Sequence, residues 1–164
     1  QTMARYNRWQ NQSLYDAAST LDDAVRRAER GAFFGSIHGT LNHLLWADQA
    51  WLNRLTDTPP PRSRSIKDSI SLHEGWDELR SARKAFDETI ITWADALDEA
   101  SLAGDLSWHS ASAGRLMTTP RALAVAHMFN HQTHHRGQVH CMLTQCGARP
   151  DDTDLPILRH RVKN

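Results

Sequence analysis

The segment from about residue 70 to 99 has the most regular pattern in the chain, and this pattern restricts the folds open to it. Large residues recur there at alternating spacings of four and three, and the series is Leu72, Trp76, Leu79, Arg83, Phe86, Ile90, Trp93 and Leu97. Such a seam is typical of a long helix that packs nearly antiparallel to its neighbours. Arg83 is the one charge in the seam, and we expect it either to extend outward or to pair with an acid such as Asp48.

Three other segments have the periodicity of helices, and they span about residues 2–20, 36–55 and 118–145. Ser36 is a suitable N-cap for the second of these helices, and Pro120 fits the first turn of the last one. Together with the seam, these segments predict an all-α four-helix bundle that forms a single domain over residues 1–164.

The connections between the predicted helices are long. Residues 26–35 are charged and then flanked by glycines, and Pro59-Pro60-Pro61 excludes a helix from the loop 56–67. Residues 101–117 follow no clear period, although 106–110 could form a short extended piece. Since no run of strands is convincing, the expected fold contains no sheet.

The composition argues against several classes of function. The chain has 19 Lys and Arg against 19 Asp and Glu, so its overall charge does not point to binding of nucleic acid or an anionic membrane. No apolar run reaches the roughly 18 residues that span a bilayer, and no signal peptide is visible. Cys141 and Cys146 are poorly placed for a disulfide framework, which favours a reducing cytoplasm.

Histidines are concentrated in one part of the last predicted helix. Four of the ten lie within nine residues, and His127, His131 and His135 are spaced by four, so a helix places them on nearly one face. Two imidazoles one turn apart can share a metal ion. His43, at the border of the apolar stripe of 36–55, could supply a third ligand if the two helices are neighbours. The alternative for His43 is a hydrogen-bonded core histidine.

Other metal motifs do not fit this sequence. A zincin needs Glu directly after the first histidine of the motif, and Gln132 follows His131. A di-iron bundle needs paired Glu-x-x-His motifs, which do not occur here. The spacing of Cys141 and Cys146 does not match Cys-x-x-Cys.

Four segments carry a resemblance to a known family. They are Tyr6 to Asn11, Gly31 to Asp48, Asn130 to Gln138 with its His-Gln-Thr-His-His-Arg-Gly core, and Thr153 to Pro156. With these segments in the same order along nearly the whole chain, the sequence resembles the DinB family, also described as DinB/YfiT-like metalloenzymes. The resemblance implies an up-down-down-up bundle with one long crossover loop, assembled as a homodimer.

The resemblance also implies a metal site. The family binds a divalent ion, zinc or nickel, through one histidine of the second helix and a His-x-x-x-His pair of the fourth. By position these ligands are His43, His131 and His135. His134 is then expected to point elsewhere, and His127 to lie beside the site.

Three neutral imidazoles leave a fourth coordination position for water or substrate. Asp48 or Gln138 could orient that water, or hold a ligand ring through its second nitrogen. Asp48 is therefore the candidate catalytic base, and a buried ion pair with Arg83 is its alternative role.

Two classes of function remain open. The first is a metal-dependent enzyme of the thiol-dependent S-transferase or hydrolase type, with a low-molecular-weight thiol as a possible substrate. The alternative is a non-catalytic metal-binding protein of the stress response, in which the ion is structural. The damage-inducible name of the family suggests a nucleic-acid role, but the neutral charge balance opposes it.

Overall fold

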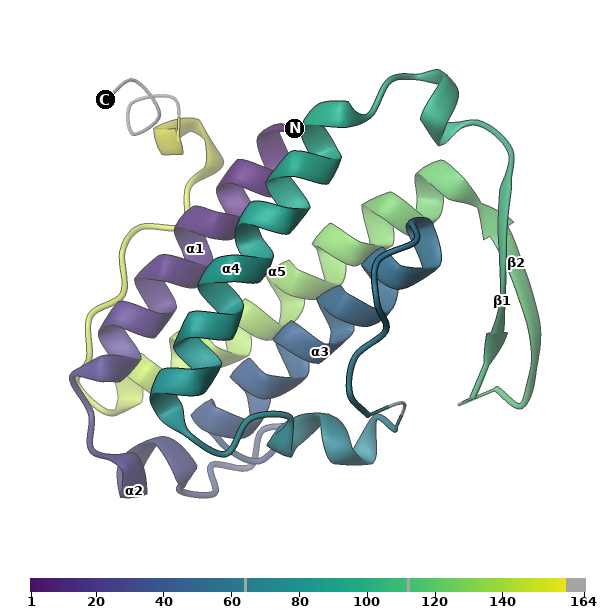
Figure 1. Cartoon of the computed structure of the whole chain (residues 1–164). Coiled ribbons are helices and arrows are strands. Elements are labelled where there is room, and N and C mark those ends of the chain that lie inside the picture. Colours follow the sequence, from purple (N-terminus) through teal and green to yellow (C-terminus); the bar gives the residue numbers. More distant parts are fainter. Residues whose placement is uncertain (64, 112, 159–164) are drawn as a thin grey trace.

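The computed structural model describes residues 1–63, 65–111 and 113–158 (Figure 1). Four long helices make up most of it: α1 Thr2–Ser19, α3 Ile37–Leu55, α4 Trp76–Ala96 and α5 Arg121–Gln145. The shorter elements are α2 Asp23–Arg27, η1 Lys67–Ser71, η2 Ala100–Leu102, η3 Leu155–Ile157 and the strands β1 Asp105–Ser110 and β2 Arg115–Pro120. The mostly helical bundle that the sequence predicts is therefore present.

Helix α3 is the most deeply buried of the four, and it packs against α4, α5 and η1. The Ser36 hydroxyl accepts a hydrogen bond from the Gly39 amide at 3.0 Å, which confirms the predicted N-cap. Apolar residues such as Leu41, Leu45 and Leu52 are fully buried on this helix. Residues of α3 are thus held on a fixed frame between two other helices.

The third predicted helix is shorter at both ends than its apolar series. Leu72 lies in the turn after η1 and still packs in the core, but α4 begins only at Trp76, after Gly75 in an extended conformation. The helix ends at Ala96, one residue before Leu97. Within α4, Leu79 and Ile90 are fully buried, as the seam requires. The apolar spacing therefore continues across the turn before Trp76, although the backbone is not one continuous helix there.

The expectation of no sheet is wrong in one region. Strands β1 and β2 form an antiparallel hairpin in which Leu106 lies opposite Thr119 and Trp108 opposite Met117. Leu106 is buried against the bundle, whereas Leu116 is exposed, so the alternation that marks a strand is weak here. Thr118, Thr119 and Pro120 belong to β2 rather than to the helix, and α5 begins at Arg121.

A buried polar layer crosses the middle of the bundle and separates two apolar clusters. One cluster includes Leu14 and Leu143, and the other includes Ala4 and Met128. The polar residues between them come from all four long helices and are Asn7, Asn11, Asp48, Arg83, Asp87, Gln132 and Arg136. Their mutual bonds fix how the helices meet, because buried polar groups need specific partners.

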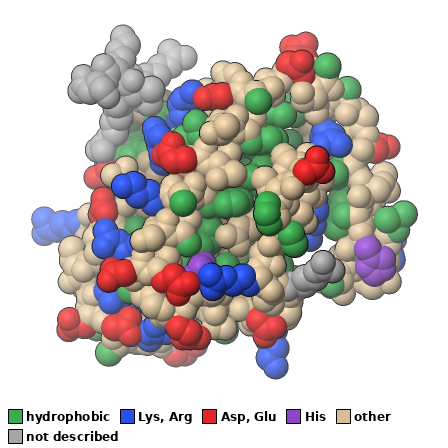
Figure 2. Space-filling model, viewed as in Figure 1, with side chains coloured by type: hydrophobic (Ala, Val, Ile, Leu, Met, Phe, Trp, Pro, Cys, Tyr) green, Lys and Arg blue, Asp and Glu red, His purple; other side chains and the backbone are tan. Residues whose placement is uncertain are grey.

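The surface is mixed in charge. Figure 2 shows positive and negative side chains interspersed over the face it presents, as the balanced composition predicts. Among the helices of the described residues, none combines the length and the apolar character needed to cross a membrane.

Candidate metal centre

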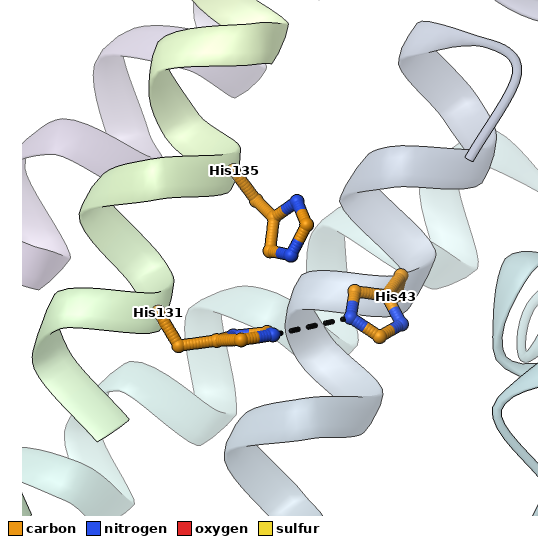
Figure 3. Close-up of side chains that lie close together, drawn as sticks. All are labelled: His43, His131 and His135. Carbon is orange, nitrogen blue, oxygen red and sulfur yellow. Dashed lines mark hydrogen bonds between the residues drawn. The ribbon is translucent and has the colours of Figure 1, made fainter. Parts of the chain in front are cut away.

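Three histidines from two helices converge at one point of the α3–α5 contact. His131 and His135 project from α5 toward His43 on α3 (Figure 3), and the Nε2 atoms of His43 and His131 are 3.4 Å apart. One ligand nitrogen from each of the three rings lies within 4.8 Å of the other two. Two nitrogens bound to one tetrahedral zinc ion would be about 3.3 Å apart. The pair that the sequence places on one helix and the distant histidine are therefore brought together.

Hydrogen bonds to the second ring nitrogens orient two of these rings. The Ser69 hydroxyl donates to the Ile66 carbonyl at 2.6 Å, so it accepts from Nδ1–H of His43, which is 2.8 Å away. The Gln138 amide oxygen accepts from Nδ1–H of His135 at 2.7 Å. Both neutral rings consequently have a free lone pair on Nε2, the form that binds a metal.

The third ring completes the set of donors. His131 Nδ1 is buried and has no hydrogen-bond partner among the described residues. With no ion bound, its Nε2–H can donate to the bare Nε2 of His43 across the 3.4 Å separation. To bind a metal through Nε2, His131 would have to carry its proton on Nδ1 instead. The donor set therefore fits a divalent cation.

The surroundings keep the three rings uncharged. Burial lowers the pKa of His43 to about 3 and that of His131 to about 4, and in each case repulsion from neighbouring histidines adds to the effect. Burial also lowers the pKa of His135, against the opposing effect of its bond to Gln138. Neutral imidazoles are the form that coordinates metal, so protons compete little for this site at neutral pH.

Two aromatic rings contact His43. The Phe34 ring stacks on it with centroids 3.6 Å apart, and the Trp46 ring lies at 5.6 Å. Phe34 comes from the loop before α3, where Gly35 has a φ of 75°. A side chain on Gly39 would meet the Phe34 carbonyl oxygen at 2.6 Å, so the close approach of this loop to α3 depends on that glycine.

Sequence reasoning found the three histidines and Gln138 but missed Ser69 and Phe34. Gln138 lies one turn after His135 on the same helix, which is a local signal. Ser69 lies 26 residues from His43, on the separate short helix η1, and no spacing connects them. The two glycines around Phe33-Phe34 were the one visible indication of a constrained loop there.

Asp48 lies in the polar layer rather than among the ring nitrogens. One of its carboxylate oxygens accepts from Arg83 at 2.8 Å, and the other accepts from the Gln132 side-chain amide. The ion pair with Arg83, the alternative that the sequence left open, is therefore present. Burial outweighs Arg83 and raises the pKa of Asp48 to about 6. Its role as a catalytic base stays a prediction, and both of its oxygens are already engaged.

The remaining histidines have separate places. His127 lies beside His131, with ring centroids 5.9 Å apart, and also contacts Trp51 at 4.8 Å. His134 is exposed on α5, and its ring lies beside that of His135 with centroids 4.7 Å apart. His38 is a core histidine whose Nε2 lies 3.1 Å from the His73 carbonyl oxygen, and His160 falls outside the described residues.

Two hollows flank the bundle. A cleft of about 720 Å³ between α1 and α4 opens over Arg83 and Asp87, and none of the three clustered histidines lines it. A second hollow, of about 520 Å³, is lined by Phe34, Gly39 and Ile70, among others. None of the three clustered histidines lines the second hollow either, but Phe34, which does, contacts His43 directly.

A helical bundle with a cluster of three histidines between two of its long helices defines a class of candidate metalloproteins. The chain belongs to the DinB family, whose pattern matches residues 1–162. The protein DinB of Bacillus subtilis (strain 168) is 26% identical over 167 residues, which cover 96% of this chain and 92% of that protein.

Two solved structures share the fold. YfiT from Bacillus subtilis, described as a probable metal-dependent hydrolase with an unusual four-helix bundle topology, aligns with a TM-score of 0.63 at 14% identity. That alignment covers 90% of this chain and 87% of YfiT. A DinB-like protein from Bacillus cereus ATCC 10987 aligns with a TM-score of 0.53 at 21% identity, over 88% of this chain and 90% of that chain.

Proposed function

We propose that this protein is a metal-dependent enzyme whose divalent ion is bound by His43, His131 and His135. The observation that carries the proposal is the convergence of three neutral imidazoles, two of which have their lone pairs fixed by Ser69 and Gln138. A bound ion would supply Lewis acidity and lower the pKa of a water or thiol in its open position. The description of YfiT as a probable metal-dependent hydrolase agrees with this chemistry.

The residues of this chain have distinct roles in the proposed site. Ser69 and Gln138 hold the rings of His43 and His135 in the metal-binding orientation. Phe34 covers one face of His43 and also lines the second hollow, so it limits how much water reaches His43 from that side. Since the described residues add no fourth His, Cys, Asp or Glu to the cluster, one coordination position is left for a ligand.

The reaction type within this class is a narrower proposal. A hydrolase would use the ion to activate water, and a thiol-dependent S-transferase would use it to stabilise a low-molecular-weight thiolate. Three imidazoles suit zinc or nickel, which we propose as the resident ions. Asp48 would act as a base only if its bonds to Arg83 and Gln132 rearranged.

We extend the proposal to the chain path and assembly. Helices α1 and α5 run from the apolar cluster that contains Ala4 and Met128 to the one that contains Leu14 and Leu143. Helices α3 and α4 run in the opposite direction between the same two clusters. This supports the up-down-down-up order, with 56–75 as the long crossover. A homodimer and a cytoplasmic location remain part of the proposal, and the free thiols of Cys141 and Cys146 suit a reducing compartment.

Elemental analysis of protein purified without added metal tests the proposal. We expect one divalent ion per chain, and we expect His131→Ala to reduce its occupancy strongly because one of three ligands is lost. His140→Ala is the matched control, since His140 lies on the same helix α5 but outside the cluster of three. Full metal content in the His131 variant, or equal losses in both variants, would overturn the assigned site.

A further inference from the structure

Arg54, near the end of α3, has an unusual environment for an arginine. Its side chain is half-buried, and its guanidinium carbon lies 4.5 Å from the centroid of the Trp51 ring and 5.4 Å from that of Trp108. Trp51 precedes it on α3, and Trp108 comes from strand β1 of the hairpin. Stacking uses the faces of the guanidinium and leaves its five in-plane N–H groups available to an acceptor.

No acceptor within the described part of the chain bonds to this guanidinium. Other enclosed arginines differ: Arg83 is paired with Asp48, and Arg136 donates to Asn7. Burial lowers the pKa of Arg54, and no neighbouring acid opposes that shift. A partly desolvated cation without an anion is costly, so this position is suited to an anionic group from outside the chain.

Arg54 lies on the same side of the bundle as the three histidines. His43, Ala47, Trp51 and Arg54 follow spacings of four, four and three, so they occupy one face of α3. Trp51 contacts His127, which in turn lies beside His131. The guanidinium stacks over Trp51, eight residues after His43, and eight residues of α-helix span about 12 Å.

We propose that the molecule bound at the metal centre carries a carboxylate, and that Arg54 binds this carboxylate at the far end of the site. The inference rests on the proposed metal function, because it assigns a second binding contact to the ligand that the metal binds. The reactive end of the ligand faces the histidines, its middle passes Trp51 and His127, and its carboxylate accepts hydrogen bonds from the Arg54 guanidinium. Trp108 gives the hairpin a role, since its ring contacts both the Trp51 ring and this guanidinium.

A matched set of ω-mercapto compounds tests the assignment on the cobalt-loaded protein. Mercaptooctanoate has a thiol for the metal and a carboxylate at a suitable distance, mercaptooctanol lacks only the charge, and mercaptopropionate is too short to reach Arg54. Calorimetric titration measures affinity, and the cobalt absorption spectrum reports whether the thiolate binds the metal. The proteins are wild type, Arg54→Met and Arg8→Met, the last because Arg8 is an exposed residue of α1 paired with Glu88.

We expect wild type to bind mercaptooctanoate roughly ten-fold or more tightly than mercaptooctanol, as a charge-assisted bond to arginine predicts. Arg54→Met should abolish this preference while leaving the affinity for mercaptooctanol unchanged, and Arg8→Met should keep the preference. The assignment is overturned if wild type shows no preference, if the preference survives in Arg54→Met, or if mercaptopropionate depends on Arg54 to the same extent.

The cobalt spectrum distinguishes a failure of the proposed metal function from a failure of the carboxylate site. If no thiol alters the cobalt spectrum, the open coordination position is refuted. The calorimetric preference for mercaptooctanoate over mercaptooctanol then decides the carboxylate site by itself: dependence on Arg54 supports the site, and its absence rejects it.

Discussion

At the scale of single residues, the candidate metal centre depends on keeping imidazoles neutral inside the protein. A histidine whose folded pKa lies below its unfolded value stabilises the fold fully above the unfolded pKa, and this contribution is lost as the pH falls toward the folded value. For His131 the window runs from 6.5 down to about 4, with burial as the main cause. Asp48 titrates in part of that window with the opposite sign, since burial raises its pKa to about 6.

The metal-free protein and its His131→Gln variant should therefore differ in their pH dependence. Between pH 6.5 and about 4, wild type should lose up to about 1.4 kcal/mol of unfolding free energy per pH unit relative to the variant, the value for one proton. Denaturant unfolding across this range measures the difference, and the comparison removes the contribution of Asp48 because both proteins contain it. Parallel curves for the two proteins would show that His131 is not held neutral by the fold.

Residue spacing predicts local partners and fails for distant ones. Gln138 could be connected with His135 from the sequence because one helical turn separates them. For Asp48 the sequence left two roles open, and its contact with Arg83, 35 residues away, depends on how α3 and α4 pack. Ser69 gave no signal, since a serine in a polar loop has many possible roles.

At the scale of elements, the loop before α3 determines the environment of His43. Phe34 reaches its stacking position because the chain turns at Gly31 and Gly35, both with positive φ, and because Gly39 lets the Phe34 carbonyl approach the helix. The loop and the first turn of α3 therefore act together to hold one of the three clustered histidines, His43.

Gly39→Ala should push the loop that contains Phe34 away from α3. The added Cβ would lie 2.6 Å from the Phe34 carbonyl oxygen, so the loop must move, and we expect a loss of about 1–3 kcal/mol in unfolding free energy together with weaker metal binding. Thermal melts and a cobalt titration measure the two effects. Gly137→Ala is the matched control, because a Cβ there meets no atom within 4 Å and should stabilise α5 by about 0.5–1 kcal/mol. Similar behaviour of the two variants would contradict the role given to Gly39.

The hairpin is the element that the pattern of apolar residues did not predict. Strands β1 and β2 bury Leu106 but leave Leu116 exposed, so the alternation of apolar and polar residues is too weak to indicate a sheet. Residues 118–120 resemble a helix start because a cap residue precedes a proline, yet their backbone pairs with β1. Strand pairing joins residues on the two sides of a turn, so the spacing of apolar residues along one strand does not predict it.

At the scale of the whole molecule, the candidate metal centre lies between helices that other contacts already hold together. Helices α3 and α5 also meet in the polar layer, where Gln132 donates to the Leu44 carbonyl at 3.2 Å, and in both apolar clusters. The bundle should therefore stay folded without its ion, which is the behaviour of an enzyme site rather than of a structural one.

Chelation tests this expectation directly. Removing the ion should lower the melting temperature, since a ligand at a thousand times its Kd contributes about 4 kcal/mol, but the helical circular dichroism and cooperative unfolding should remain. Adding back zinc or nickel should restore the original melting temperature. A metal-free chain that loses its helices at room temperature would instead favour the alternative in which the ion is structural.

The sequence by itself determined the helical class, the N-cap at Ser36 and the spacing of His131 and His135, because each depends on residues within a few positions of one another. The resemblance to the DinB family singled out His43. Only the tertiary structure decided that His43 meets the other two rings, that Ser69 and Phe34 orient and cover it, and that Asp48 is committed to Arg83. These contacts join segments far apart in the chain, and their distances are set by how whole helices pack rather than by any local pattern.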